Sequence, residues 1–456
     1  MAKKLWGGRF KKPIDKDFEE FSKSIQYDYK LAEYDIYHSK IHTLTLQKSG
    51  ILTLEEAKKI LQALNSISEA VKKGAFKPDN TSEDIHTAIQ NLLEKKVGNL
   101  ALKLHTLRSR NDQIVFDMKW YCKSESVKLM KMLFDILESF AEAATQYKEQ
   151  AFLGYTHTQR AQVIRYYDYL MAFHNVFNRD LNRVSQFYDN TVAYIGAGAL
   201  AGSSLSKEAY DQAITQFLDK EKVLTKVVKQ VENSLDNVSS RDFIIEFLSI
   251  LAIIQTHLSR FSEDMILYST QEFNYVDLPE EFCTGSSLMP HKKNPDFLEL
   301  VRGYTGQVNG SLVAVLTTMK GLPLSYNRDM QLDKEPLFSS VDIIKNELKI
   351  MAKFIKGIKL NKKVIAQALE DECLYATELA EFLVYEKVAF KDAHDIVGRL
   401  IRYSQDKNIK IKEMPDKLLR TFHRALNQKD IKKIMTPEHA IKSKKSINRK
   451  KPKIKK

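Results

Sequence analysis

The chain has 456 residues, 43% of them hydrophobic, and a formal net charge of +13. This length allows a large buried core and predicts two or three domains. Three widely spaced cysteines, with no C-x-x-C pair among them, argue against a disulfide framework or a zinc site and favour a reducing compartment.

Residues 1–110 are predicted to form an N-terminal domain of mixed helix and loop, with turn signals in GGRF and KPDNTSED. The initial MAKKLWGGRF has no apolar signal-peptide segment, so we expect no export. The longest charge-free apolar stretch, residues 247–259, is too short to span a bilayer. These observations predict a cytoplasmic protein.

Residues 111–361 are predicted to form a central domain of long helices. No proline occurs between Pro78 and Pro279, and both glycine and proline are missing from 99–153, 155–195 and 203–278. The last of these runs has apolar residues at 3-4 spacing, which indicates a helix packed along its length. These apolar positions are Ile244, Phe247, Leu251, Ile254, Leu258, Phe261, Met265 and Tyr268.

Further apolar residues widen this stripe until the helix is apolar on nearly all sides, so it must be buried from several directions. One chain rarely encloses such a helix when it is about 30–40 residues long. We therefore expect a helical bundle that associates with copies of itself. A monomeric helical domain is the alternative that the sequence leaves open.

Residues 285–299, GSSLMPHKKNPDFLE, combine hydroxyl, ammonium and amide groups. Gly285, Pro290 and Pro295 predict a loop, because they disfavour regular helix or strand. Such a loop can close over a carboxylate and polarise it. The same composition is also typical of a solvated surface loop.

Residues 362–441 are predicted to form a smaller C-terminal helical domain, interrupted at KNIKIKEMPDK. The tail, 442–456, holds nine Lys or Arg and no acid, and removing those nine charges from +13 leaves +4. We interpret it as a disordered, solubilising extension. Nucleic-acid binding through this tail alone is the alternative.

The order of residues in several segments resembles a known family. GSSLMPHKKN matches all seven specified positions of the signature loop of the fumarase/aspartase superfamily, here 283–297. Flanking segments resemble the argininosuccinate lyase family in particular. They are LWGGRF (5–10), SIQYDYKLAEYDI (24–36), SEDIH (82–86), HTLRSRNDQ (105–113), GYTHTQRAQ (154–162), GALAGSS (198–204), SSRDF (239–243) and LPLSYNRDMQLDKE (322–335).

The resemblance implies a mainly α, fumarase/aspartase-like fold of three domains, whose long central bundle is completed in a homotetramer with active sites shared between chains. It implies a carbon–nitrogen lyase that splits argininosuccinate reversibly into L-arginine and fumarate, the last step of arginine biosynthesis. The alternatives are another superfamily lyase, acting on adenylosuccinate, aspartate or malate, or a catalytically silent crystallin-like relative. We find no nucleotide-binding or metal-ligand motif and expect no cofactor and no metal.

The elimination needs a base for a carbon-bound proton, cations around the developing dianion and an acid for the leaving nitrogen. The resemblance assigns catalysis to Ser286, His157, Lys292 and Glu299. We favour Ser286 as base and His157 as acid, although the reverse assignment uses the same residues. Lys292 is expected to grip a substrate carboxylate, and Glu299 to orient His157 and raise its basicity.

The same resemblance assigns substrate contacts. Thr156, Ser287 and Asn294 are expected near the succinyl part, and Tyr326, Gln331 and Lys334 near the arginine part. Ser24, Asp28, Arg110 and Asn111 complete the set. A structural reading is compatible with these roles, because Asn111 or Asp112 would also suit a helix N-cap.

Several residues depart from the family pattern without removing a catalytic group. Leu107 stands where Gly or Ala is usual and is expected to crowd the substrate-binding turn. The other departures are Gln90, Leu153, Thr158, Val163 and His291.

Overall fold

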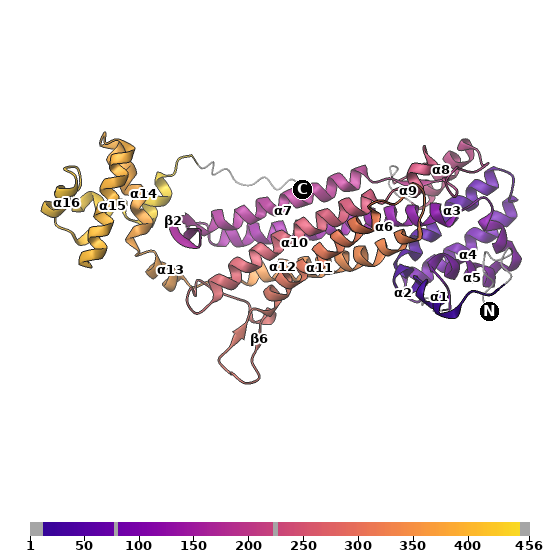
Figure 1. Ribbon diagram of the computed structural model, residues 1–456, viewed down its shortest axis with the longest axis horizontal. Coiled ribbons are helices and arrows are strands. Elements are labelled where there is room, and N and C mark those ends of the chain that lie inside the picture. Colours follow the sequence, from indigo (N-terminus) through magenta and orange to yellow (C-terminus); the bar gives the residue numbers. More distant parts are fainter. Residues whose placement is uncertain (1–11, 77–80, 222–226, 447–456) are drawn as a thin grey trace. The chain divides into compact units, whose positions relative to one another are not determined.

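The computed structural model describes residues 12–76, 81–221 and 227–446, and the prediction of a mainly α chain is confirmed within them (Figure 1). The described residues do not include segments 5–10 and 77–80 or residues 447–456 of the basic tail. The prediction of a disordered tail is wrong for its first residues, because a helix extends to Ser443 and Lys444 pairs with Glu378 and Glu381 at 3.0 and 3.1 Å. Two compact units make up the chain. Unit 1 comprises residues 1–134, 179–258 and 301–348, and unit 2 comprises 135–178, 259–300 and 349–456.

Five long helices contribute residues to both units. They are α6 (Arg110–Gln146), α7 (Tyr166–Asn190), α10 (Asp242–Ser269), α11 (Asp296–Met319) and α12 (Lys334–Gly357). Three of them lie in the runs without glycine or proline, as the sequence predicts. The three-domain division at 110, 361 and 441 stays a prediction.

Unit 1 contains the N-terminal helices, and α3 packs against α4, α5 and α8 in its core (Figure 1). The helix α3 is buried along most of its length because neighbours cover several of its faces. The other elements of unit 1 are α1 (Lys16–Phe21), α2 (Ile25–Asp28), η1 (Tyr29–Leu31), α3 (Ala32–Lys48), α4 (Leu54–Lys72), α5 (Ile85–Val97), η2 (Gly98–His105), β3 (Ala193–Ile195), α8 (Lys207–Glu221), β4 (Val228–Gln230), α9 (Ser234–Ser239) and η4 (Arg328–Asp333), where η marks a 3₁₀ helix.

The GALAGSS segment forms a tight turn beside the start of α6. The backbone N–H groups of Gly196 and Ala197 donate to the carboxylate of Asp112 at 2.9 and 3.2 Å. Gly198 has φ 59, and a Cβ there would lie 2.3 Å from the carbonyl oxygen of Gly202. Only glycine fits this approach, so the motif keeps its tight turn, while the two residues before it tie the loop to α6.

Unit 2 contains short antiparallel hairpins and the C-terminal helices. In it, β1 pairs with β2, β5 with β8, and β6 with β7. Its elements are β1 (Ala151–Thr156), β2 (Gln159–Arg165), β5 (Val276–Asp277), η3 (Glu280–Phe282), β6 (Thr284–Gly285), β7 (Lys293–Asn294), β8 (Lys359–Leu360), α13 (Lys362–Ala368), η5 (Glu372–Tyr375), α14 (Ala376–Tyr385), α15 (Phe390–Lys407), η6 (Ile411–Glu413), α16 (Asp416–Phe422), α17 (Gln428–Ile434) and α18 (Pro437–Ser443).

The helix α10 confirms the predicted apolar heptads, since all eight of those positions are buried. This helix is long and apolar enough to cross a membrane, although 56% of its most apolar stretch is buried inside the protein. Gln255 is buried within it and donates to the carbonyl of Val301 at 2.9 Å. A buried polar side chain with a protein partner is typical of a packed core helix, and we interpret α10 as one.

Candidate active site

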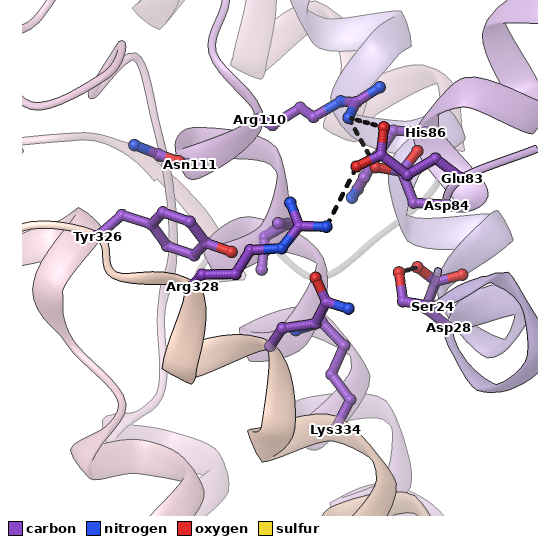
Figure 2. A pocket seen from close by; sticks show the side chains of 12 residues that line it. Ser24, Asp28, Glu83, Asp84, His86, Arg110, Asn111, Tyr326, Arg328 and Lys334 are labelled. Carbon is purple, nitrogen blue, oxygen red and sulfur yellow. Dashed lines mark hydrogen bonds and ion pairs between the residues drawn. The ribbon is translucent and has the colours of Figure 1, made fainter. Parts of the chain in front are cut away.

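A cavity of about 260 Å³ in unit 1 brings together seven of the residues assigned to substrate binding (Figure 2). These seven are Ser24, Asp28, Arg110, Asn111, Tyr326, Gln331 and Lys334. They come from three chain segments that are far apart in the sequence, 24–28, 110–111 and 326–334. Their convergence on one cavity is independent of the resemblance that selected them.

Ser24 and Asp28 form one buried wall of the pocket. The hydroxyl of Ser24 donates to Asp28 at 2.7 Å, and the backbone N–H of Ile85 donates to the other carboxylate oxygen at 3.1 Å. Burial raises the pKa of Asp28 to about 6, although the hydrogen bond from Ser24 opposes this shift. Because this value still lies below neutral pH, Asp28 is mostly ionised there and is suited to a cationic ligand group.

The start of α6 supplies Arg110 and Asn111. The helix begins at Arg110, so the expectation that Asn111 or Asp112 is the N-cap is wrong. Ser109 takes that role, since its hydroxyl accepts from the backbone N–H of Asn111 at 3.2 Å. Asp112 binds the Gly196–Ala197 backbone instead, and the Asn111 amide donates to the carbonyl of Ala199 at 3.1 Å.

Glu83 lies between two guanidinium groups at the pocket, as Figure 2 shows. Its carboxylate accepts from Arg110 at 3.5 Å and from Arg328 at 3.2 Å. Arg110 also pairs with Asp84 at 3.0 Å. The site thus holds carboxylates and guanidinium groups side by side, which suits a ligand with both charges.

The pocket lining includes residues that the sequence analysis did not single out, namely Glu83, Asp84, His86, Ile114 and Arg328. Four of them lie in SEDIH and YNRDMQ, segments that carried the family resemblance. Their charge and position in these motifs were the signal that would have identified them. Ile114 follows Arg110 by one helical turn and had no comparable signal.

Lys334 is held beside the pocket by a buried ion-pair chain. Its ammonium donates to Asp333 at 2.9 Å, and the other oxygen of Asp333 accepts from Arg241 at 2.6 Å. Arg241 and Asp333 are both almost fully buried. These ion pairs join the SSRDF and LDKE segments, so they fix the position of Lys334.

His86 belongs to a buried cluster with Asp35 and Asp117, whose ligand-type atoms lie within 4.8 Å of one another. Burial alone would lower the pKa of His86, but the Asp35 carboxylate, 2.8 Å away, outweighs it and raises this pKa. Burial raises the pKa of Asp117 well above its usual range. Because the Nδ1 of His86 is already bonded to Asp35, we interpret the cluster as an ion pair that supports the pocket wall.

The signature loop lies in unit 2, where β6 and β7 close its base (Figure 1). The prediction that no regular structure crosses 285–299 is therefore wrong at both ends, because Gly285 pairs with Lys293 and α11 begins at Asp296. The carboxylate of Asp296 accepts from the backbone and hydroxyl of Thr284, which ties the two ends together. Residues 286–292 form the irregular tip.

Within this tip, the Ser286 hydroxyl oxygen accepts from the backbone N–H groups of Leu288 and Met289 at 3.3 and 3.0 Å. Ser287 and Lys292 are exposed in the single chain, and so is Glu299 at the start of α11. The side chain of Asn294 donates to the carbonyl of Gly285 at 3.5 Å. The tip thus directs two N–H dipoles at one serine oxygen.

Thr156 and His157 lie at the end of the β1–β2 hairpin, also in unit 2, and both are exposed in the single chain. His157 and Thr158 form the two-residue turn, with φ 51 and 57.

Leu107, in unit 1, also has a left-handed backbone, with φ 57, so it is strained where glycine would not be. The expectation that Leu107 crowds the substrate-binding turn stays a prediction.

Two family models match the chain. One described as Lyase covers residues 8–310, and one described as Argininosuccinate lyase C-terminal covers residues 373–442.

Curated relatives match over most of their length. The chain is 41% identical to an argininosuccinate lyase of Caldanaerobacter subterraneus subsp. tengcongensis over 97% of this chain and 98% of the relative. It is 42% identical to that of Geobacter sp. (strain M21), over 90% and 88%. It is 44% identical to that of Carboxydothermus hydrogenoformans, over 87% and 86%.

Solved structures agree on the fold. An EDDS lyase in complex with formate has a TM-score of 0.78 at 25% identity, covering 90% of this chain and 81% of that one. A class II fumarase from Schistosoma mansoni has a TM-score of 0.77 at 16% identity, covering 90% of each chain, and shows the likeness of fold alone.

Proposed function

Because the chain belongs to the argininosuccinate lyase family of the fumarase/aspartase superfamily, we propose that its unit 1 pocket binds argininosuccinate and that Ser286 and His157 act in the elimination. The reaction is the reversible β-elimination of argininosuccinate to L-arginine and fumarate, the last step of arginine biosynthesis. The observation that carries the proposal is the convergence of seven assigned substrate residues on one pocket.

The charges of the pocket support binding of the arginine part. Asp28 faces the cavity as a carboxylate suited to an amino or guanidino group, and Lys334 supplies an ammonium for the α-carboxylate. Tyr326 and Gln331 add neutral polar groups, and Arg110 and Asn111 complete the contacts beside them. The lining therefore offers a partner for each charged group of an amino acid with a cationic side chain.

In the elimination, Ser286 removes the proton next to the carboxylate and His157 protonates the leaving nitrogen. The N–H groups of Leu288 and Met289 that point at the Ser286 oxygen support this assignment, because they stabilise negative charge on it. Lys292 and Asn294 hold the carboxylate that gains charge, with Thr156 and Ser287 as further binding hydroxyls. Glu299 orients His157. Closure of the loop tip over substrate excludes water from the serine.

A direct assay tests the function. We expect purified protein to release fumarate from argininosuccinate, followed by absorbance, and to release much less from adenylosuccinate. Turnover only with adenylosuccinate would assign the chain to another branch of the superfamily. No turnover with either substrate would favour the crystallin-like alternative.

We further propose a cytoplasmic homotetramer whose active sites combine residues of different chains. An exposed apolar face on α11 supports the association. Val313 and Leu316 are 59% and 45% exposed there, and a Cβ at Gly303 or Gly306 would meet no other atom within 4 Å. Apolar surface beside glycines suits close packing of another helix. The exposure of His157 and Lys292 in the single chain also fits sites that a partner completes.

Complementation between inactive variants tests shared sites. We expect His157→Asn and Lys334→Met to be inactive alone, and a mixture denatured and reassembled together to recover up to about a quarter of wild-type activity, because sites with both wild-type residues form by random assembly. Activity would be measured after refolding equal amounts. Each variant refolded alone is the control. A reassembled tetrameric mixture without any recovery would contradict shared sites.

The raised pKa of Asp28 predicts a pH dependence of L-arginine binding. A cationic ligand binds the ionised carboxylate, so below about pH 6 Asp28 must lose its proton before the ligand binds. The affinity for L-arginine should therefore fall by up to tenfold per pH unit as the pH decreases. Calorimetric titration from pH 5 to 8 measures this. Asp28→Asn should bind weakly with a flat profile, whereas Asp329→Asn, at an exposed carboxylate nearby, should keep the wild-type profile. A wild-type affinity that does not change across pH 6 would contradict the role of Asp28.

A further inference from the structure

The turn that carries His157 is strained, so something must hold it. Thr156 pairs with Gln159, which leaves His157 and Thr158 as a two-residue hairpin loop with positive φ at both positions. Such loops favour Asn and Gly, and a β-branched residue such as Thr158 is costly there. A conformation of this kind persists only when the surrounding structure imposes it.

The two faces of the hairpin differ in their partners. Tyr155 and Arg160 are cross-strand neighbours one position before and after the Thr156–Gln159 pair. Side chains alternate along a strand, so Tyr155 and Arg160 point away from the face on which Thr156 lies. One face is thus available to substrate, while the other can be anchored.

The Arg160 guanidinium is the centre of the anchored face. It donates to Asp371 at 3.2 Å and to the hydroxyl of Tyr275 at 3.4 Å. The hydroxyl of Tyr275 also bonds to that of Tyr155 at 2.9 Å. Both strands of the hairpin are therefore joined to Tyr275, and β2 is also joined to Asp371.

Those outside groups are themselves fixed. Asp371 caps the η5 helix, because its second oxygen accepts from the backbone N–H of Cys373 at 3.1 Å. The carbonyl of Tyr275 accepts from the backbone N–H of Asn361 at 2.9 Å. The helix η5 opens the segment matched by the C-terminal family model, so the anchor connects the hairpin to that segment.

We infer that Arg160 is a positioning residue: through Asp371 and Tyr275 it holds the His157 turn in its strained conformation, and by this link the C-terminal segment controls the acid–base step. The inference rests on the proposed function, in which His157 acts on the substrate. It assigns the C-terminal segment a role in catalysis.

Asp371→Asn tests the link, because its Oδ1 can still cap η5 while its amide no longer pairs with the guanidinium. We expect kcat for argininosuccinate to fall at least about tenfold with little change in KM, since misplacing a catalytic group costs rate rather than binding. Asp371→Glu, which restores the charge, should recover most of that loss. Equal kcat values for Asp371→Asn and wild type would overturn the inference.

Asp395→Asn is the matched control, because it breaks the exposed pair with Arg399 on α15 in the same unit and should leave kcat unchanged. Tyr275→Phe removes one hydroxyl and keeps the ring packed, so it tests the same link if Asp371→Asn folds poorly. We expect its kcat to fall severalfold, and wild-type kcat in this variant would also count against the inference.

Hydrogen–deuterium exchange separates this inference from the proposed function. In Asp371→Asn, the peptide covering 151–165 should exchange faster than in wild type or Asp395→Asn, with no substrate present. If wild type shows no turnover, the proposed function fails while the exchange result still decides the anchoring. Unchanged exchange in this peptide would overturn the anchoring even in an active enzyme.

Discussion

We expect Ser286→Ala to lower kcat by about 10²–10⁴-fold while leaving substrate affinity largely intact, because a general base contributes about this much. The Ser286 oxygen accepts two backbone N–H groups, so its removal takes away the atom on which the loop tip concentrates positive potential. Steady-state fumarate release gives kcat. Calorimetric titration of the Ser286→Ala variant with argininosuccinate gives the substrate affinity.

Ser287→Ala is the neighbouring control. Ser287 accepts no comparable pair of N–H groups among the hydrogen bonds of the described residues, and its proposed role is binding. This variant should raise KM with a small change in kcat. The base would have to be reassigned if Ser286→Ala kept a near-normal kcat, or if Ser287→Ala lost more rate than Ser286→Ala.

Asp333→Ala is expected to be the most destabilising single change in the unit 1 site. It would leave the buried guanidinium of Arg241 without its carboxylate, and breaking a buried ion pair costs about 3–5 kcal/mol. It would also release the ammonium of Lys334 from its partner. Urea denaturation followed by circular dichroism measures the change in the free energy of unfolding.

The exposed pair of Arg399 and Asp395 supplies the comparison. Surface pairs of this kind contribute about 0–1 kcal/mol, so Asp395→Ala should change the unfolding free energy little. If Asp333→Ala and Asp395→Ala proved equally mild, Arg241 would have found another partner or water. The proposed anchoring of Lys334 would then be wrong.

Local chemistry made the fold class predictable. Apolar residues at 3-4 spacing, without glycine or proline, specify a helix by steric and burial requirements that hold along the segment itself, and α10 confirms them. The same local reasoning failed at 285–299. Proline and glycine there indicated a loop, but Gly285 and Lys293 pair across it, and nothing within either residue marks its partner.

Site residues divide in the same way. Motif order in the sequence was enough to predict Asp28, Arg110 and Lys334 as site residues. The folded structure was needed to show that they line one cavity, that Glu83 lies between two guanidinium groups and that Arg241 pairs with Asp333. Those relations join positions many residues apart, and their energies come from desolvation and distance in three dimensions, which spacing along the chain does not encode.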